Sequence, residues 1–359
     1  MKRILITAYD LNIGGIERAL INLLKNIHNK YDITLALEHK KGELLDQIPK
    51  DVNIIEYKVE SNGNFIIRKL KNFIKYIKWV CKYKNKFDFS ICYATYSIPG
   101  KKIALCSSKK NAIWIHTNYK ILYGDNKKTM EFFKLMDLRK FRKCIFVSEE
   151  ALNDAISVYP EIASKSIFCN NYVDVEDILK KSKEPISLKK DKTITFINVS
   201  RHDESSKKIT RIIKAAQMLS YDNLNFRIIM IGDGPDHSMY VDMVKDYGLT
   251  KKILFLGSKK NPFPYYKMSD CVVLSSDYEG FPVVFLESLV LEKDIISTKV
   301  SDYKNLKRYI TFVEKNEKSL YIAMKKYIEG NLKKTNLKYD IRKLNSEIDK
   351  KIDYIIGGE

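Results

Sequence analysis

Short apolar runs alternate along the chain with segments in which apolar residues recur every three or four positions. The runs are typical of buried strands, and the 3.6-residue period between them is typical of helices. Ile16, Leu20, Leu24 and Ile27, for example, lie on one face of a predicted helix. This alternation predicts parallel sheets covered by helices. In the first half of the chain the runs lie at residues 4–6, 33–37, 54–55, 89–92, 113–115, 145–147 and 167–169.

A polar, charge-rich stretch over residues 177–192 interrupts this pattern and includes Pro185. It predicts a linker, because the apolar runs then start again. A chain of 359 residues also has room for two domains. We therefore predict an α/β fold of two Rossmann-like units, residues 1–176 and 193–338, and a closing helix over 339–359 that packs back toward the first unit. The restarted runs lie at residues 194–199, 226–231, 253–256, 271–274 and 295–297.

The formal net charge is +20, and both halves of the chain are basic. Such an excess attracts anionic partners, although lysines on solvated faces throughout the chain are an equal alternative. Residues 65–87 stand out, because Ile66, Leu70, Phe73 and Ile77 keep helical register while the remaining positions are rich in lysine and free of acid. With Trp79 and Tyr76 near its polar boundary, this segment predicts an amphipathic helix on an anionic membrane surface. The alternative is a helix packed on its own sheet with a solvated lysine face.

The cysteines show no metal-ligand spacing, and four of the six lie in apolar, strand-like contexts. We expect reduced thiols and a cytoplasmic protein, peripheral on the inner face of the membrane. The first strand begins at once, so no signal peptide is expected, and no apolar run is long enough for a membrane span.

The clearest chemical pattern is the segment DYEGFPVVFLE over residues 277–287, which follows a predicted strand. Ligands in doubly wound folds lie beyond the carboxyl ends of strands, where the free amides of a helix start favour phosphate. Gly280 allows close approach of a ligand to the backbone. Glu279 in the loop and Glu287 two turns along the helix are expected to accept hydrogen bonds from sugar or ribose hydroxyls.

The segment SRHDESSKKI over residues 200–209 follows another strand and also opens a helix. Arg201, with Lys207 and Lys208, supplies fixed positive charge that neutralises a diphosphate and stabilises it as a leaving group. A third loop at a strand end, Gly232-Asp233-Gly234-Pro235, is by itself equally consistent with a plain turn.

Two features of the first half extend this picture. Gly14 and Gly15 form a strand-to-helix turn that differs from the dinucleotide-binding pattern and is expected to approach a phosphate or an acceptor. His116 follows the run 113–115 at a strand end, where a structural role is somewhat more common than a chemical one.

Together these segments resemble the GT-B glycosyltransferases, specifically the large retaining family often called GT4, over nearly the whole chain. EGFPVVFLE matches that family's Glu-x7-Glu signature, and SRHDESSKKITRIIKAA over residues 200–216 is similar to its Arg…Lys stretch. GDGP and GGIERALINLL are similar to its usual loops. The stretch Asn170-Asn171-Tyr172-Val173-Asp174 is a partial match to its segment before the interdomain crossing.

The resemblance implies a role for each matched residue. Arg201 and Lys207 would bind the donor diphosphate, Lys207 being favoured because the family places a glycine-like residue where Lys208 stands. Glu287 would bind the ribose and Glu279 the donor sugar. Gly15 would approach the donor phosphates or the acceptor, and His116 would lie near the reacting carbon. Backbone contacts would come from Gly280, Phe281, Pro282 and Val283.

The family also implies transfer with retention from a nucleotide sugar, UDP-sugars being favoured, to a glycan or lipid-linked acceptor in bacterial surface polysaccharide synthesis. No Asp-x-Asp triplet occurs, and we expect neither metal nor another cofactor. Three alternatives remain. One is another sugar-nucleotide enzyme on this architecture, such as an epimerase or phosphorylase, and another is charge-driven nucleic-acid binding, for which zinc spacing and aromatic motifs are missing. The third is a non-catalytic GT-B subunit that binds a partner, against which the intact pair Glu279 and Glu287 argues.

Overall fold

The computed structural model describes residues 1–94, 97–300, 303–332 and 339–358. The chain divides into two compact units, Met1–Tyr172 with Asn345–Glu359 and Val173–Leu344. The first unit thus ends four residues before the predicted boundary, and part of the predicted linker is helical. The predicted end of the second domain, residue 338, lies outside the described residues.

The first unit is built on a parallel sheet of seven strands in the order β3-β2-β1-β4-β5-β6-β7. Buried apolar residues fill its central strands, as expected of a sheet covered on both faces. In register, Ile4 pairs with Ile33 on one side and with Phe89 on the other. The strands are β1 (Lys2–Ala8), β2 (Tyr31–Leu37), β3 (Asn53–Glu56), β4 (Phe89–Cys92), β5 (Asn111–Ile115), β6 (Lys143–Phe146) and β7 (Ser166–Phe168).

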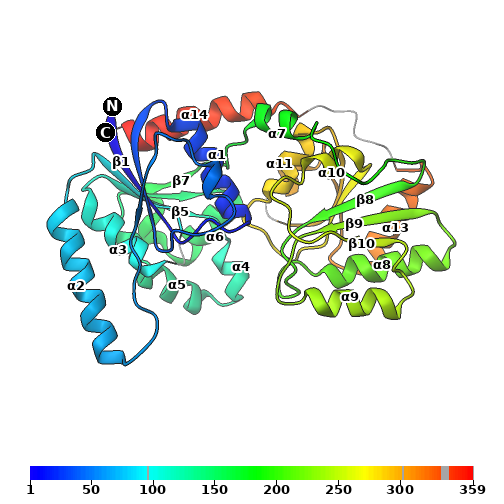
Figure 1. Ribbon diagram of the computed structural model, residues 1–359, viewed down its shortest axis with the longest axis horizontal. Coiled ribbons are helices and arrows are strands. Elements are labelled where there is room, and N and C mark those ends of the chain that lie inside the picture. Colours follow the sequence, from blue (N-terminus) through cyan, green and yellow to red (C-terminus); the bar gives the residue numbers. More distant parts are fainter. Residues whose placement is uncertain (95–96, 301–302, 333–338, 359) are drawn as a thin grey trace. The chain divides into compact units, whose positions relative to one another are not determined.

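Helices lie on both sides of this sheet (Figure 1). Helix α14 (Ile341–Gly357) begins in the second unit and belongs to the first from Asn345 on. Its residues Ile348, Ile352 and Ile355 are buried, and Asn26 donates a 2.5 Å hydrogen bond to Asp349. The other helices are α1 (Gly15–Ile27), α2 (Phe65–Tyr83), α3 (Ile98–Ser107), α4 (Tyr119–Tyr123), α5 (Asn126–Leu135) and α6 (Glu149–Val158).

The second unit contains a parallel sheet of six strands in the order β10-β9-β8-β11-β12-β13. Its core packs β8 and β9 against α8 and α13, with Phe196, Ile212, Ile228 and Leu320 wholly buried. The strands are β8 (Ile194–Val199), β9 (Phe226–Ile231), β10 (Ile253–Phe255), β11 (Cys271–Leu274), β12 (Asp294–Thr298) and β13 (Thr311–Val313). The helices are α7 (Val175–Lys181), α8 (Ile209–Tyr221), α9 (His237–Asp246), α10 (Phe263–Met268), α11 (Val283–Val290), α12 (Tyr303–Leu306) and α13 (Glu317–Ile328).

The strand order of each sheet contains a reversal point, where a ligand site is expected. It reverses between β1 and β4 in the first sheet and between β8 and β11 in the second. The carboxyl ends of two strands diverge at such a point, which is where doubly wound folds bind ligands. The loops after β8 and β11, which carry the sequence-predicted charges, therefore meet at the reversal point of the second sheet.

Helix α2 does not bury its apolar face against the protein, as a surface helix usually does. The Asn64 side chain caps it by accepting hydrogen bonds from the amides of Ile66 (2.9 Å) and Ile67 (3.3 Å). Its apolar residues Leu70 and Phe73 are exposed, so this stripe does not pack on the sheet of the first unit. Trp79, expected at a membrane boundary, is instead buried, and its Nε1 donates a 2.9 Å hydrogen bond to Ser107.

Candidate active site

The loops after β8 and β11 are fastened to each other by backbone and side-chain hydrogen bonds. The amide of Asp277 donates to the carbonyl of Ser206 (2.9 Å), and the Ser275 hydroxyl donates to the carbonyl of Lys207 (2.8 Å). Because these bonds join the two backbones directly, the charged side chains on the loops are held at fixed positions.

Lys207 and Glu279 form the central ion pair of this site. Lys207 Nζ lies 2.6 Å from Glu279 Oε1, and the Ser276 hydroxyl donates to the same oxygen at 2.7 Å. The side chains of Lys207 and Glu279 are 23% and 14% exposed, so a ligand can reach both. The structure thus brings together the predicted diphosphate-binding lysine and the predicted sugar-facing carboxylate.

Lys208 is separated from its neighbour by its backbone conformation. Its φ of 51° and ψ of 45° are left-handed, a conformation that glycine adopts without strain. The Lys208 ammonium lies 3.7 Å from Asp277, whereas that of Lys207 lies 2.6 Å from Glu279. The glycine-like position implied by the resemblance is therefore Lys208, which supports Lys207 as the ligand-facing lysine.

Arg201 is exposed at the end of β8, and its side chain forms no hydrogen bond or ion pair with any described residue. A guanidinium without a protein partner keeps all of its donors for a planar anion such as phosphate. Arg201 and Lys207 belong to the same loop after β8, where Lys207 is paired with Glu279 and Arg201 is unpaired among the described residues.

Arg211 is a contributor that sequence reasoning missed. Its guanidinium lies 2.6 Å from Asp277 and donates a 2.9 Å hydrogen bond to the carbonyl of Ser275. It lies on α8, within the stretch 200–216 that resembles the family but without a role assigned to it there, and it links the helix that follows one loop to the backbone of the other. Its position in the first turn of that helix was the available signal.

Gly232 and Gly234 serve the packing of a third loop against the first. A Cβ at Gly232, where φ is 143°, would lie 1.9 Å from the carbonyl oxygen of Ser200, and one at Gly234 would lie 2.3 Å from that of His202. The amide of His202 donates to the carbonyl of Asp233 at 3.0 Å. The packing of the two loops therefore explains why glycine stands at both positions, without a ligand.

His202 lies beneath these loops and was also not anticipated. It is fully buried, with its Nδ1 2.7 Å from Nδ1 of His237 and the two rings stacked. Burial and the neighbouring His237 lower the pKa of His202 to about 4, so the imidazole is neutral at neutral pH. It acts as a packed support for the backbone that carries Arg201.

The Glu-x7-Glu segment divides between the loop and the helix. Pro282 immediately precedes α11, which begins at Val283 and not at the proline, and the side chains of Phe281, Pro282 and Val283 are buried while Gly280 is half-buried. Glu287 is 4% exposed, and its Oε2 accepts a 3.2 Å hydrogen bond from Tyr266. The two carboxylates therefore differ in environment, since Glu279 is accessible and Glu287 is buried in this structure.

The predicted residues of the first unit lie at its own reversal point and beyond β5. A Cβ at Gly15 would meet nothing within 4 Å, whereas one at Gly14 would meet the flexible end of Glu17. His116 is buried, its ring lies 4.5 Å from that of Tyr93, and its Nε2 has no hydrogen-bond partner among the described residues. Burial lowers the pKa of His116 to about 3, so this imidazole is neutral.

Two further findings concern metals and membranes. Nowhere in the described part of the chain do three or more His, Cys, Asp or Glu side chains converge as metal ligands would. Among the described residues, no helix combines the length and the apolar character that crossing a bilayer requires.

Comparison with known proteins gives consistent matches. Residues 180–344 match the family model described as glycosyl transferases group 1. Over 350 residues the chain is 25% identical to the N-acetylgalactosamine-N,N'-diacetylbacillosaminyl-diphospho-undecaprenol 4-alpha-N-acetylgalactosaminyltransferase of Campylobacter jejuni, with 92% of this chain and 91% of that protein covered. It is 23% identical over 316 residues to the capsular polysaccharide biosynthesis glycosyltransferase CapH of Staphylococcus aureus, at 83% and 82% coverage. The fold is similar to that of Anabaena HepE in a crystal structure with UDP and glucose, with a TM-score of 0.79, 15% identity and coverage of 98% and 100%.

Proposed function

We propose that this chain, a glycosyltransferase of the GT-B fold whose residues 180–344 match the family model described as glycosyl transferases group 1, is a retaining, metal-independent enzyme that uses a nucleotide sugar. The fold and the family resemblance predicted from the sequence are thereby confirmed. The nucleotide sugar, with UDP favoured as its nucleotide, would donate to a hydroxyl of a lipid-linked glycan in bacterial surface polysaccharide synthesis. The named activities of the relatives, on a diphospho-undecaprenol glycan and in capsule synthesis, support this acceptor class.

One observation carries the donor assignment: the loop that holds Lys207 against Glu279 also carries the exposed Arg201, and it lies at the reversal point of the second sheet. Arg201 and Lys207 would bind the diphosphate of the donor, and their fixed charges would stabilise it as it leaves. Two protein cations can neutralise this group without a divalent ion. Glu279, released from Lys207 by the incoming phosphate, would accept a hydrogen bond from a hydroxyl of the donor sugar.

In the proposed transfer, the bond between the anomeric carbon and the diphosphate oxygen breaks and leaves an oxocarbenium-like centre. The acceptor hydroxyl forms the new bond on the same face, and its proton passes to the departing diphosphate. His116 of the first unit is buried, and its lowered pKa keeps it neutral, so the role that the family resemblance implies for it does not depend on a charge.

Calorimetric titration of UDP, GDP and UDP-sugars in EDTA tests the donor site. We expect one nucleotide to bind, and Arg201→Ala or Lys207→Gln to weaken its binding about 10- to 100-fold, since a hydrogen bond to a charged group is worth about 1.5–3 kcal/mol. Arg227→Ala is the matched control, because Arg227 pairs with Asp191 and lies at the start of β9. Equal affinity in the Arg201 and Arg227 variants would contradict the site.

Glu279→Gln separates sugar recognition from diphosphate binding. We expect UDP to bind at least as tightly as to the wild type, because Lys207 no longer has a competing carboxylate, while kcat for transfer falls about 100-fold. Steady-state kinetics with a radiolabelled donor measures kcat. A parallel loss of UDP affinity would show that Glu279 organises the loop and does not face the sugar.

We also propose that the enzyme works at an anionic membrane surface, through the segment 65–87. This segment carries eight Lys or Arg residues and no acidic residue. A lipid-linked acceptor would be met at such a surface.

A further inference from the structure

Helix α2 presents an apolar stripe that nothing in the first unit covers. Seven of the nineteen large hydrophobic side chains that are exposed in the described residues belong to this one helix, among them Ile66 at 74% and Phe73 at 60%. Residues 66, 70, 73 and 77 fall on one face of a helix, with 67 and 74 beside them. Contiguous exposed apolar surface of this kind marks a site of interaction.

The opposite side of α2 fixes the helix to the unit. Trp79 packs edge-on against Tyr57, with ring centroids 5.1 Å apart, and donates a hydrogen bond to Ser107. Asn72 exchanges two hydrogen bonds with the backbone of Glu60, of 2.7 and 3.0 Å. Because these contacts hold one side of the helix on the protein, the apolar stripe points away from the unit.

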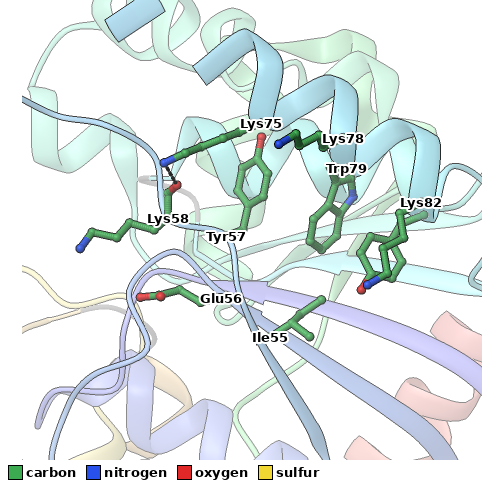
Figure 2. A pocket seen from close by; sticks show the side chains of 9 residues that line it. Ile55, Glu56, Tyr57, Lys58, Lys75, Lys78, Trp79 and Lys82 are labelled. Atoms are coloured by element: carbon green, nitrogen blue, oxygen red, sulfur yellow. Dashed lines mark hydrogen bonds between the residues drawn. The ribbon is translucent and has the colours of Figure 1, made fainter. Parts of the chain in front are cut away.

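Between α2 and the end of β3 lies an open pocket of about 520 Å³. Figure 2 shows Lys75 and Lys78 of the helix close to Tyr57, with Lys82 further along the helix and Lys58 and Glu56 on the strand side. Four lysines and a single acid, Glu56, line the pocket, whose floor is aromatic. Its lining consists of Ile55, Glu56, Tyr57, Lys58, Lys75, Lys78, Trp79, Lys82 and Tyr83.

The charges of this pocket are only partly used by the protein. Lys75 donates to the carbonyl of Lys58 (2.9 Å) and to Glu60 (2.7 Å), and Glu56 accepts from the amide of Lys40. Lys82 lies over the ring of Tyr83, 5.0 Å from its centroid. Lys78 forms no hydrogen bond or ion pair with a described residue. Lys78 and Lys82 are therefore available to an anion.

We propose that the apolar stripe of α2 inserts into the surface of a bilayer and that the adjoining lysine pocket binds the phosphate of an anionic phospholipid headgroup. A helix lying in the interface buries its apolar face about 5–10 Å deep and keeps its lysines at headgroup level. Residue 78 borders the stripe, and residues 75 and 82 lie further round the helix toward Trp79, so the pocket adjoins the stripe at Lys78 and extends toward the end of β3. The inference rests on the proposed membrane partnership, and it adds a defined ligand site to a general charge attraction.

Flotation with vesicles of phosphatidylcholine, with and without phosphatidylglycerol, tests both parts. The pocket variant is Lys78→Gln with Lys82→Gln, and the control is Lys69→Gln with Lys71→Gln, which removes the same charge from the same helix outside the pocket. Loss of the general electrostatic attraction should lower the affinity of each variant for phosphatidylglycerol vesicles about fivefold per lysine removed. We expect the pocket variant to lose roughly a further tenfold, as a lost charge-assisted hydrogen bond would.

A fluorophore on Cys81 reports the insertion itself, because this cysteine is exposed on α2 whereas the other five are buried or half-buried. We expect a blue shift on phosphatidylglycerol vesicles that Leu70→Ser with Phe73→Ser abolishes. Both side chains are exposed, so the fold should tolerate the change.

Four outcomes would overturn the proposal. Wild-type binding that does not distinguish the two vesicles removes the membrane partnership, and equal losses in the pocket and control variants remove the headgroup site. Displacement of the protein from vesicles by inorganic phosphate would mean that the pocket takes free anions. Equal binding to phosphatidylcholine vesicles carrying only a polyprenyl diphosphate would assign the pocket to the acceptor. Calorimetric donor affinity, which all these variants should retain, separates these failures from failure of the proposed donor site.

Discussion

At the scale of single residues, backbone conformation gives the adjacent lysines Lys207 and Lys208 different roles, although the residue type is the same. Lys208 is held in the left-handed region, where a side chain costs about 1–2 kcal/mol, while Lys207 extends to Glu279. The protein tolerates this strain at the start of α8 because the loop contact around Asp277 fixes the backbone on both sides.

Replacement of Lys208 by glycine should therefore stabilise the protein. The relief of strain exceeds the extra entropy that glycine gains in the unfolded chain, so we expect the free energy of unfolding to rise by about 0.5–1 kcal/mol. Nucleotide affinity should stay within a few-fold of wild type. Lys214→Gly, at an exposed position inside α8, is the control and should cost about 1 kcal/mol. Denaturant unfolding checks both, and destabilisation by Lys208→Gly would refute the argument.

The buried His116 should make stability depend on pH. Its pKa is lowered to about 3 in the folded protein and is near 6.5 when unfolded, so the unfolded state binds the proton first and stability is lost as pH falls below 6.5. From pH 7 to 4.5 this loss amounts to about 2–3 kcal/mol. Between these pH values the His116→Gln variant should lose about 2–3 kcal/mol less of its free energy of unfolding than the wild type. The buried His202 makes a contribution of the same sign, which remains in both proteins. Parallel curves for the two proteins would contradict this.

The sequence was informative about which residues carry charge at strand ends and less so about their surroundings. Arg201, Lys207 and Glu279 could be predicted because the loops that follow parallel strands meet at one edge of the sheet. The burial of Glu287 could not, because it depends on how α10 and α11 pack; for Arg211 the sequence showed a cation in the first turn of α8 but not that Asp277 is its partner.

At the scale of elements, continuous apolar runs predicted the strands well, since parallel strands are buried on both faces. The short edge strand β13 was missed, because it has only three residues, Thr311–Val313, and these are half-buried. For α2, the periodicity identified the helix, but the same period describes a stripe that faces a core and one that faces outward. The contacts of Trp79 and Asn72 decide between them, and they depend on tertiary structure.

The fit between the loops after β8 and β9 should make Gly232 sensitive to any side chain. Alanine at this position adds a clash with the Ser200 carbonyl to the cost of a positive φ, so Gly232→Ala should destabilise by about 3 kcal/mol or more. Gly248→Ala is the control, since its φ is also positive, at 68°, but its Cβ would meet open space. We expect it to cost about 1 kcal/mol in denaturant unfolding. Equal losses of stability in the Gly232→Ala and Gly248→Ala variants would mean that the loop after β8 shifts to accommodate the added Cβ without strain.

At the scale of the whole molecule, each unit has its own core, and α14 completes the core of the first. We expect calorimetric unfolding to report the two units separately. Ile352→Ala, at a buried position of α14, should destabilise the first unit by about 3 kcal/mol and leave the second unchanged. Ile322→Ala, at an exposed position of α13 in the second unit, should change neither by more than about 0.5 kcal/mol. If both transitions shift with Ile352→Ala, the units unfold as one.

The return of α14 to the first unit has a consequence for biosynthesis. The 172 residues of Val173–Leu344 are translated between the seventh strand of the first sheet and the helix that covers it. At about 5–20 residues per second, the ribosome needs roughly 10–35 s for this insert. During that interval the nascent first unit waits with an uncovered apolar flank while the second unit emerges as a self-contained folding body. A chaperone that shields nascent chains would therefore find its main binding site on the half of the protein that is made first and finished last.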